Sequence, residues 1–217
     1  MNPRIRRARV AIGLLLTACA LSMTTVATAQ TPYSVKPIAQ KKIKQLPPGP
    51  LYWRVENFAT LTDAKAAVGP DGWNPATVRY ETTAALIAES AGKVWVLTLG
   101  PKGASTPGAT PVAEIGPLPT VTASEYLLRV NEGSGPPGSE TPVHSHPGSE
   151  AFYVISGELG QRTAHGVDRV EAGHTMNGHD AGMAMQVFNS GSTDLIALIM
   201  FVVDASKPFS EPTTLGK

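Results

Sequence analysis

Cysteine is almost absent from this 217-residue sequence, and the single one, Cys19, lies close to the N-terminus. If the segment that contains it is removed, the mature chain has no thiol, which excludes a disulfide framework and a cysteine nucleophile. Charged residues make up only 16% of the sequence and aromatic residues 6%. There is no basic patch of the kind that binds nucleic acid, so the composition predicts no nucleic-acid partner.

The N-terminal 29 residues have the order of features that is typical of a secretory signal peptide. Four arginines lie between residues 4 and 9, an apolar run covers residues 10–21, and Ala27-Thr28-Ala29 offers a cleavage site. The run is too short and too often interrupted to span a bilayer, which takes about 20 apolar residues. We therefore expect a periplasmic or secreted mature chain that begins at Gln30, has no transmembrane segment, and carries a formal net charge of −3 instead of +1.

The same segment has a second interpretation. Leu16-Thr17-Ala18-Cys19 resembles the processing box of bacterial lipoproteins, in which Cys19 would be the lipidated residue. Processing there would leave the protein anchored to a membrane by its lipid, whereas cleavage after Ala29 would release it. The sequence keeps both alternatives open.

Composition divides the chain into four parts. After the signal peptide at 1–29, residues 30–50 are rich in lysine and proline and predict a flexible linker. Residues 51–123 predict an N-terminal extension that packs on the following domain and contains a strand at its start and a short helix at 60–68. Residues 124–217 predict the main domain.

Short runs of β-branched and aromatic residues, separated by glycine and proline, dominate from residue 93 onward. Strands are expected near residues 94–99, 112–115, 125–130, 141–146, 150–156, 158–163, 166–170, 175–178, 185–189 and 195–203. Their close spacing predicts an all-β sandwich or barrel instead of alternating strands and helices. Residues 72–91 allow either helix or strand.

The segment from His144 to Glu150 (HSHPGSE) constrains the chemistry most. Two histidines separated by one residue on a strand point to the same face, with their Cα atoms roughly 7 Å apart. Pro147-Gly148 supplies a turn, after which Glu150 can bring a carboxylate to the same place. Two imidazoles and one carboxylate, with coordination positions left open, are the ligand set of non-haem Fe(II) and related sites. The segment therefore predicts a metal site that a ligand can reach.

Residues 138–157 (GSETPVHSHPGSEAFYVISG) match the first signature motif of the cupin superfamily, G-x5-H-x-H-x3-E-x6-G, at every defined position. The chain thus resembles a single-domain cupin over roughly residues 124–203. The resemblance implies a cupin-type double-stranded β-helix, or jelly roll. It also implies one divalent transition metal (Fe, Mn, Ni, Cu or Zn) bound by His144, His146 and Glu150.

The second cupin motif, roughly G-x5-P-x-G-x2-H-x3-N, is degenerate in this chain. Alignment on Gly182 and Asn189 places Met185 where the family has the histidine that completes the metal shell. Met185 is either a hydrophobic residue that lines the cavity or a soft thioether ligand, which would favour copper. His179, six residues earlier, is the other candidate for an additional ligand.

Strand alternation predicts which further side chains face the pocket. Two residues share a face with Glu150 and two share a face with Met185, while a strand near residue 129 adds a candidate anchor for an anionic ligand. The predicted pocket residues are Phe152, Val154, Val187, Asn189 and Arg129.

Two functions of different classes follow. The first is a metal-dependent, dioxygenase-like oxidoreductase acting on a small organic molecule, with Glu150 as a permanent ligand or as a catalytic base. The second is a non-catalytic periplasmic module that binds a small ligand or a metal, which the degenerate second motif favours. Because dimers are common in the proteins it resembles, a homodimer is a further expectation.

Overall fold

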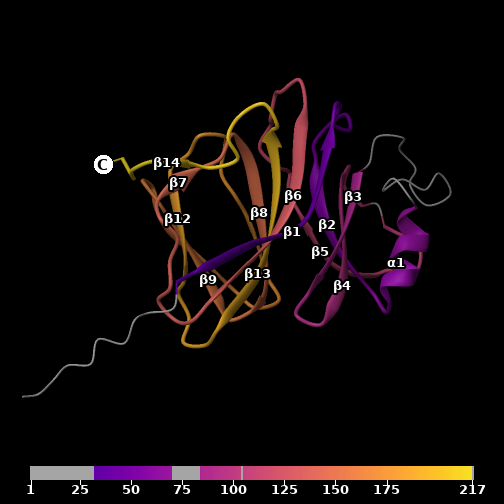
Figure 1. Ribbon diagram of the computed structural model, residues 1–217, viewed down its shortest axis with the longest axis horizontal. Coiled ribbons are helices and arrows are strands. Elements are labelled where there is room, and N and C mark those ends of the chain that lie inside the picture. The colour runs from indigo at the N-terminus through magenta and orange to yellow at the C-terminus, as the bar shows by residue number, and fades with distance from the viewer. Residues whose placement is uncertain (1–31, 70–83, 104, 217) are drawn as a thin grey trace, which may run out of the picture.

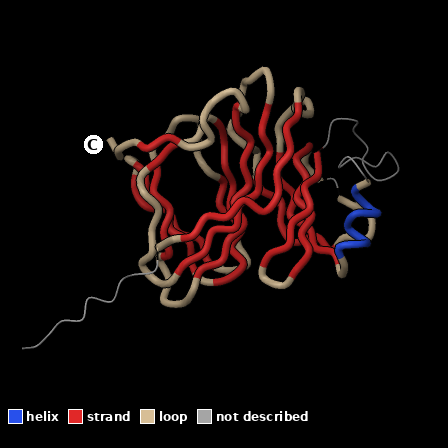
Figure 2. The backbone as a smooth tube through the Cα atoms, viewed as in Figure 1, coloured by secondary structure: helices blue, strands red, loops and turns tan. Residues whose placement is uncertain are grey.

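The computed structural model describes residues 32–69, 84–103 and 105–216, which are almost entirely β-structure (Figures 1 and 2). The strands are β1 (Ser34–Ile43), β2 (Tyr52–Phe58), β3 (Ala84–Ser90), β4 (Lys93–Gly100), β5 (Thr110–Ile115), β6 (Tyr126–Gly135), β7 (His144–Ser145), β8 (Gly148–Ser156), β9 (Glu158–Thr163), β10 (Gly166–Glu171), β11 (Thr175–Asn177), β12 (Met185–Asn189), β13 (Leu195–Asp204) and β14 (Glu211–Pro212). The predicted signal peptide and most of the ambiguous stretch at 72–91 lie outside the described residues. In the described part, no helix has the length and apolar character needed to cross a bilayer.

Two five-stranded sheets form the barrel on the left of Figure 1. The first barrel sheet has the strand order β1-β6-β13-β8-β11, and the second has the order β10-β9-β12-β7-β14; all the strand pairs are antiparallel. Side chains from both sheets meet in one buried cluster that includes Phe152, Leu159 and Val187. The predicted all-β, double-stranded β-helix is confirmed.

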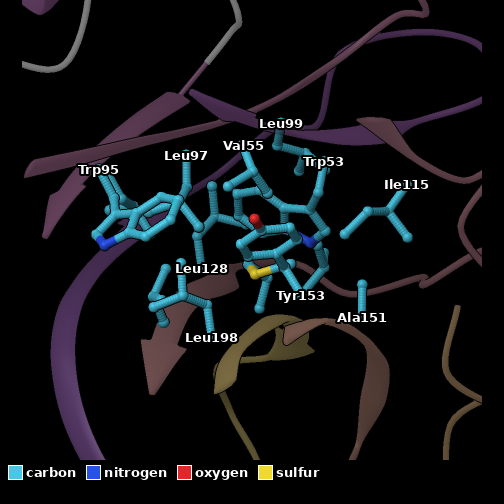
Figure 3. Close-up of a cluster of buried hydrophobic side chains, with 14 of the residues drawn as sticks. Trp53, Val55, Trp95, Leu97, Leu99, Ile115, Leu128, Ala151, Tyr153 and Leu198 are labelled. Atoms are coloured by element: carbon cyan, nitrogen blue, oxygen red, sulfur yellow. The ribbon is translucent and has the colours of Figure 1, made fainter. Parts of the chain in front are cut away.

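A third sheet, with the order β3-β4-β2-β5, packs against the outer face of the first barrel sheet. We call it the N-terminal sheet. Trp53 and Trp95 from this sheet join Tyr153 of β8 in a large apolar cluster between the two sheets (Figure 3). The aromatic rings of Trp95 and Tyr153 lie 5.6 Å apart between centroids. The extension is therefore part of the same packed structure as the barrel.

Helix α1 (Leu61–Val68) covers the opposite face of the N-terminal sheet, where Ala64 and Val68 pack in a third apolar cluster. The helix begins as its sequence predicts, because the Thr60 side chain accepts a hydrogen bond from the backbone N–H of Asp63. It ends at Gly69, whose positive φ of 81° suits a residue without a side chain.

The prediction of a flexible linker at 30–50 is corrected by strand β1. Residues 34–43 pair with β6 and form the edge of the first barrel sheet, with a register shift between Pro37 and Ala39. Lysine and proline are residues that natural proteins place on edge strands to block further pairing. The composition that indicates a linker is thus equally that of a protected edge strand, and only the pairing with β6 distinguishes them.

Candidate functional site

A cavity of about 510 Å³ lies between the two barrel sheets and contains the residues singled out by the first motif. Its lining is mainly apolar, as is usual for small-molecule sites. The lining residues are Tyr33, Val35, Pro37, Arg129, Asn131, Thr141, Pro142, Val143, His144, His146, Glu150, Val187, Ile199, Phe201, Phe209, Ser210 and Pro212. The fold therefore brings His144, His146 and Glu150 into one pocket.

The two histidines lie side by side in the pocket wall. Their ring centroids are 4.9 Å apart and their planes are nearly perpendicular. The Nδ1 atom of His144 lies 2.9 Å from the backbone oxygen of Pro142, and that of His146 lies 2.6 Å from the oxygen of Phe209. A carbonyl oxygen can only accept, so each Nδ1 carries a proton, and in the neutral form of the ring the lone pair is on Nε2. This is the tautomer of a histidine that binds a metal through Nε2.

Aromatic packing keeps His146 neutral. Its ring is buried between Phe201 and Phe209, with centroid distances of 4.8 Å to each. Burial lowers the pKa of His146 to about 4, and the neighbouring His144 and Arg129 act in the same direction, although the hydrogen bond to Phe209 opposes them. The imidazole is therefore uncharged at neutral pH, which leaves its lone pair available.

Glu150 is a fully buried carboxyl on β8 with one side-chain hydrogen bond, donated by Nε2 of Gln161. Burial raises the pKa of Glu150 to about 8, and the bond from Gln161 lowers it in part. The turn after β11 closes over this side chain, since the backbone N–H of Gly178 donates to the Glu150 carbonyl at 3.0 Å. A Cβ at position 178 would lie 2.4 Å from Cγ of Glu150, so only glycine fits there.

The set of donor groups suits a divalent metal, but the three side chains are not arranged around a common point where an ion could bind. Two imidazoles and a carboxyl line one pocket, which is the ligand chemistry of non-haem Fe(II) and related sites. Within residues 32–69, 84–103 and 105–216, however, no three His, Cys, Asp or Glu side chains lie close enough together to hold an ion. His144, His146 and Glu150 would hold a metal only after their side chains move closer together.

Neither candidate for the additional ligand lines the pocket. Met185 is buried on β12 directly opposite His144, and its sulfur lies 3.3 Å from Nε2 of Gln161. His179 lies in the turn after Gly178, and its Nε2 atom is buried without a hydrogen-bond partner among the described residues. Their roles as ligands stay predictions.

Of the five predicted pocket residues, Arg129 and Val187 line the cavity, whereas Phe152, Val154 and Asn189 lie elsewhere in the barrel. Phe152 and Val154 are completely buried in the barrel core, below the cavity lining. Asn189 stabilises the turn regions around it, because its Nδ2 donates to the backbone oxygens of Gly135 and Thr193. Strand alternation predicts the face on which a side chain lies, but not how deep in the barrel it is placed.

Arg129 lies at the rim of the pocket. Its Nε atom donates to Oε1 of Gln40 on β1 at 2.9 Å, and its guanidinium lies 4.1 Å from the ring centroid of Phe209. Burial lowers the pKa of Arg129 from its usual value. The alternative of a fully exposed surface residue is therefore excluded, while its role as an anion anchor stays a prediction.

Sequence reasoning missed three pocket residues whose side chains could contact a ligand, namely Tyr33, Asn131 and Phe209. Tyr33 precedes β1 and lay within the predicted linker, so no sequence signal marks it. Burial, followed by the charge of Glu150, raises the pKa of the Tyr33 phenol, which keeps it protonated. Asn131 could have been found, because alternation along β6 places it on the same face as Arg129.

Comparison with known proteins yields structural similarity only. No family model matches the chain, and no curated protein sequence matches it. An oxalate oxidase in complex with the substrate analogue glycolate is 25% identical, with a TM-score of 0.33 over 39% of this chain and 45% of that chain. A cupin domain from Bordetella pertussis Tohama I is 23% identical, with a TM-score of 0.31 over 35% of this chain and 80% of the other.

A third match is the polyketide cyclase RemF from Streptomyces resistomycificus, which is 16% identical, with a TM-score of 0.34 over 42% of this chain and 63% of that protein. The matched region spans less than half of the oxalate oxidase chain. One of these proteins is described as a cupin domain. Similarity at this level does not extend to activity.

Proposed function

We propose that this protein binds a small organic ligand in the barrel pocket, beside one divalent transition metal held by His144, His146 and Glu150. The observation that carries the proposal is the pair of neighbouring imidazoles whose Nδ1 atoms are both bonded to backbone carbonyls. Two backbone carbonyls thus fix the same tautomer in both rings, as the outer shell of a metal site does. The predicted signal peptide makes the periplasm or the extracellular medium the proposed location.

The chain's own residues explain how such a site would select and shield its ligand. Apolar side chains, among them Ile199 and Phe201, exclude water from most of the cavity wall. Phe209 fixes the orientation of His146 through its backbone oxygen and also packs on its ring. The Glu150 carboxyl holds a proton near neutral pH when no cation is beside it, because burial disfavours its charge. A bound ion would supply Lewis-acid activation of a chelating ligand.

Oxygenase chemistry on a molecule with two adjacent oxygen atoms is the catalytic form of this proposal. Three protein ligands leave about three octahedral positions, enough for a bidentate substrate and O2. The non-catalytic alternative is a binding module, and the observation that favours it is the unclosed arrangement of the three ligand side chains. Both share the same metal and the same pocket, so the metal is tested first.

Elemental analysis of the untagged mature protein tests the metal site. We expect about one equivalent of a divalent metal per chain and its loss in the double variant His144→Ala/His146→Ala. Occupancy should also fall as the solution is acidified, since protons compete with the metal for its ligands and the pKa of the Glu150 carboxyl is raised to about 8. The matched control is His165→Ala/His174→Ala, which removes two exposed histidines outside the pocket. Full occupancy in the first double variant would disprove the assignment.

Oxygen consumption by the metal-loaded protein then separates the two forms of the proposal. Turnover with catechols or diketones, absent from the His144→Ala/His146→Ala variant, supports the oxygenase. Stoichiometric metal without turnover supports the binding module.

A further inference from the structure

Two buried polar atoms in the pocket wall have no hydrogen-bond partner among the described residues. They are the phenol oxygen of Tyr33 and Oδ1 of Asn131, and both residues line the cavity. Tyr33 is 8% exposed and Asn131 is 1% exposed. A buried polar atom without a partner destabilises the folded state, so two of them in one small pocket call for an explanation. A ligand that satisfies both atoms provides one.

The two groups are neighbours because β6 contains a glycine at the right position. Asn131 and Gly133 lie on the same face of β6, with their Cα atoms roughly 7 Å apart. The Tyr33 ring occupies the space above Gly133, where an added Cβ would lie 2.5 Å from the phenol oxygen. Strand β1 crosses the barrel as the edge strand in Figure 1, and Tyr33, directly before it, contributes its phenol to the same cavity wall as Asn131.

Complementary chemistry defines what these atoms accept. A phenol O–H donates, and it can also accept, whereas the amide Oδ1 can only accept. One hydroxyl on a ligand, or two adjacent hydroxyls, can accept from Tyr33 and donate to Asn131. The rest of the wall around them is apolar and includes Val187, Ile199 and Phe201, so the body of the ligand that packs there is apolar as well.

We propose that Tyr33 and Asn131 determine ligand specificity by receiving a hydroxyl group of a neutral phenol or alcohol with an apolar body. The inference rests on the proposed function in that the ligand occupies the pocket beside His144 and His146. It does not depend on the metal, because neither residue belongs to the metal-binding set. It assigns a role to the segment before β1, which the first motif does not include.

Calorimetric titration with catechol and with its dimethyl ether, veratrole, tests this proposal. Veratrole keeps the ring and both oxygens but has no hydrogen to donate to Asn131. We expect the mature protein to bind catechol at least ten-fold more tightly than veratrole. Tyr33→Phe and Asn131→Leu should each weaken catechol binding about ten-fold and leave the weak binding of veratrole unchanged. The titrations use the protein as purified and after treatment with a chelator.

Tyr126→Phe is the matched control, because the Tyr126 hydroxyl is outside this pocket and accepts a hydrogen bond from the backbone N–H of Ala123. It should leave catechol affinity unchanged and lower the thermal midpoint of the free protein. Tyr33→Phe should instead raise that midpoint by a few degrees, since it removes an unsatisfied buried hydroxyl. A variant that merely damages the pocket would lower the midpoint, so the two measurements together exclude that explanation.

The proposal is wrong if the wild-type protein does not prefer catechol to veratrole, or if Tyr33→Phe binds catechol as tightly as the wild type. Failure of the metal proposal looks different. In that case the protein contains no metal, yet its catechol affinity still depends on Tyr33 in the chelator-treated sample, and the inference drawn here stands.

Discussion

The two faces of strand β8 lie in opposite environments: one packs against the N-terminal sheet and the other borders the cavity. On the outer face, Ala151 and Tyr153 pack against Trp53 and Trp95 of the N-terminal sheet in a cluster of buried apolar side chains (Figure 3). On the inner face, one residue away, Glu150 places a carboxyl beside a cavity. The outer face gains stability from close packing, whereas the inner face gives up part of it to keep polar groups and open space in the barrel.

This difference shows how the N-terminal extension contributes to the stability of the barrel. The barrel interior is interrupted by a cavity of about 510 Å³, and polar atoms in its wall have no hydrogen-bond partner within the described part of the chain. The apolar contact with the N-terminal sheet stabilises the outer face of the first barrel sheet, and the strands of this sheet also carry pocket residues on their inner face. Proteins commonly offset a strained or polar site with packing elsewhere.

The largest expected effect comes from breaking the packed face. Trp95→Ala removes a completely buried ring that contacts Tyr153 and donates from Nε1 to the Ser90 carbonyl. It should lower the free energy of unfolding by about 3–5 kcal/mol, as measured by urea denaturation. Val167→Ala, at an exposed position, is the control and should change it by less than about 0.5 kcal/mol. Equal losses in the two variants would contradict the packing assigned to the interface.

The next effect concerns the carboxyl on the inner face. The pKa of Glu150 in the folded protein is about 8, above its ordinary value of 4.5, so the folded state binds this proton more tightly than the unfolded state does. The metal-free protein should therefore lose stability as pH rises from about 4.5 to 8, on the order of a few kcal/mol. Glu150→Gln should remove most of this decrease and be the more stable protein at pH 8.

Denaturation of the chelator-treated protein at several pH values measures this dependence. Glu125→Gln, which changes a carboxylate paired with Lys42 near the surface, should keep the wild-type decrease. A wild-type protein whose stability does not fall between pH 5 and 8 would show that Glu150 is hydrated or paired in solution.

A smaller effect is expected where the second motif departs from the family pattern. Met185 lies opposite His144 in the pairing of β12 with β7, a position whose Cβ is about 4.5–5.5 Å from that of its partner. Met185→His should add an imidazole beside the two present and tighten Zn(II) binding at least ten-fold in a chelator competition assay. His179→Ala should leave the affinity nearly unchanged. If His179→Ala loses the metal and Met185→His gains nothing, the alignment of the second motif is wrong.

The smallest effect is local to the extension. Thr60→Ala removes the side chain that caps α1 and should lower the free energy of unfolding by about 1 kcal/mol. Metal content and catechol affinity should not change, since the helix packs on the face of the N-terminal sheet that is remote from the barrel. A change in either would mean that the extension acts on the pocket directly.

Local sequence patterns predicted elements well where neighbouring residues decide the structure. The strand at 158–163 and the helix from Leu61 to Val68 form where composition, alternation and capping indicate. Both imidazoles of the His-x-His segment line the same pocket. The depth at which a side chain lies in the barrel was not predictable. Phe152 shares a face with Glu150 and yet lies in the core, because the side chains of the opposite sheet pack against Phe152.

The sequence by itself determined the all-β class, because runs of β-branched and aromatic residues between turn residues favour short strands. Strand alternation alone does not account for the side-by-side placement of His144 and His146, because β7 ends at Ser145 and His146 lies outside it. Only the tertiary structure decided that residues 34–43 close the sheet and that Tyr33 enters the pocket above Gly133. It also decided that Gln161, which lies outside the first motif, bonds to Glu150. The contacts of Tyr33 and β1 with β6 join segments about 80 to 100 residues apart in the sequence, and no local pattern encodes which distant strand will be the neighbour.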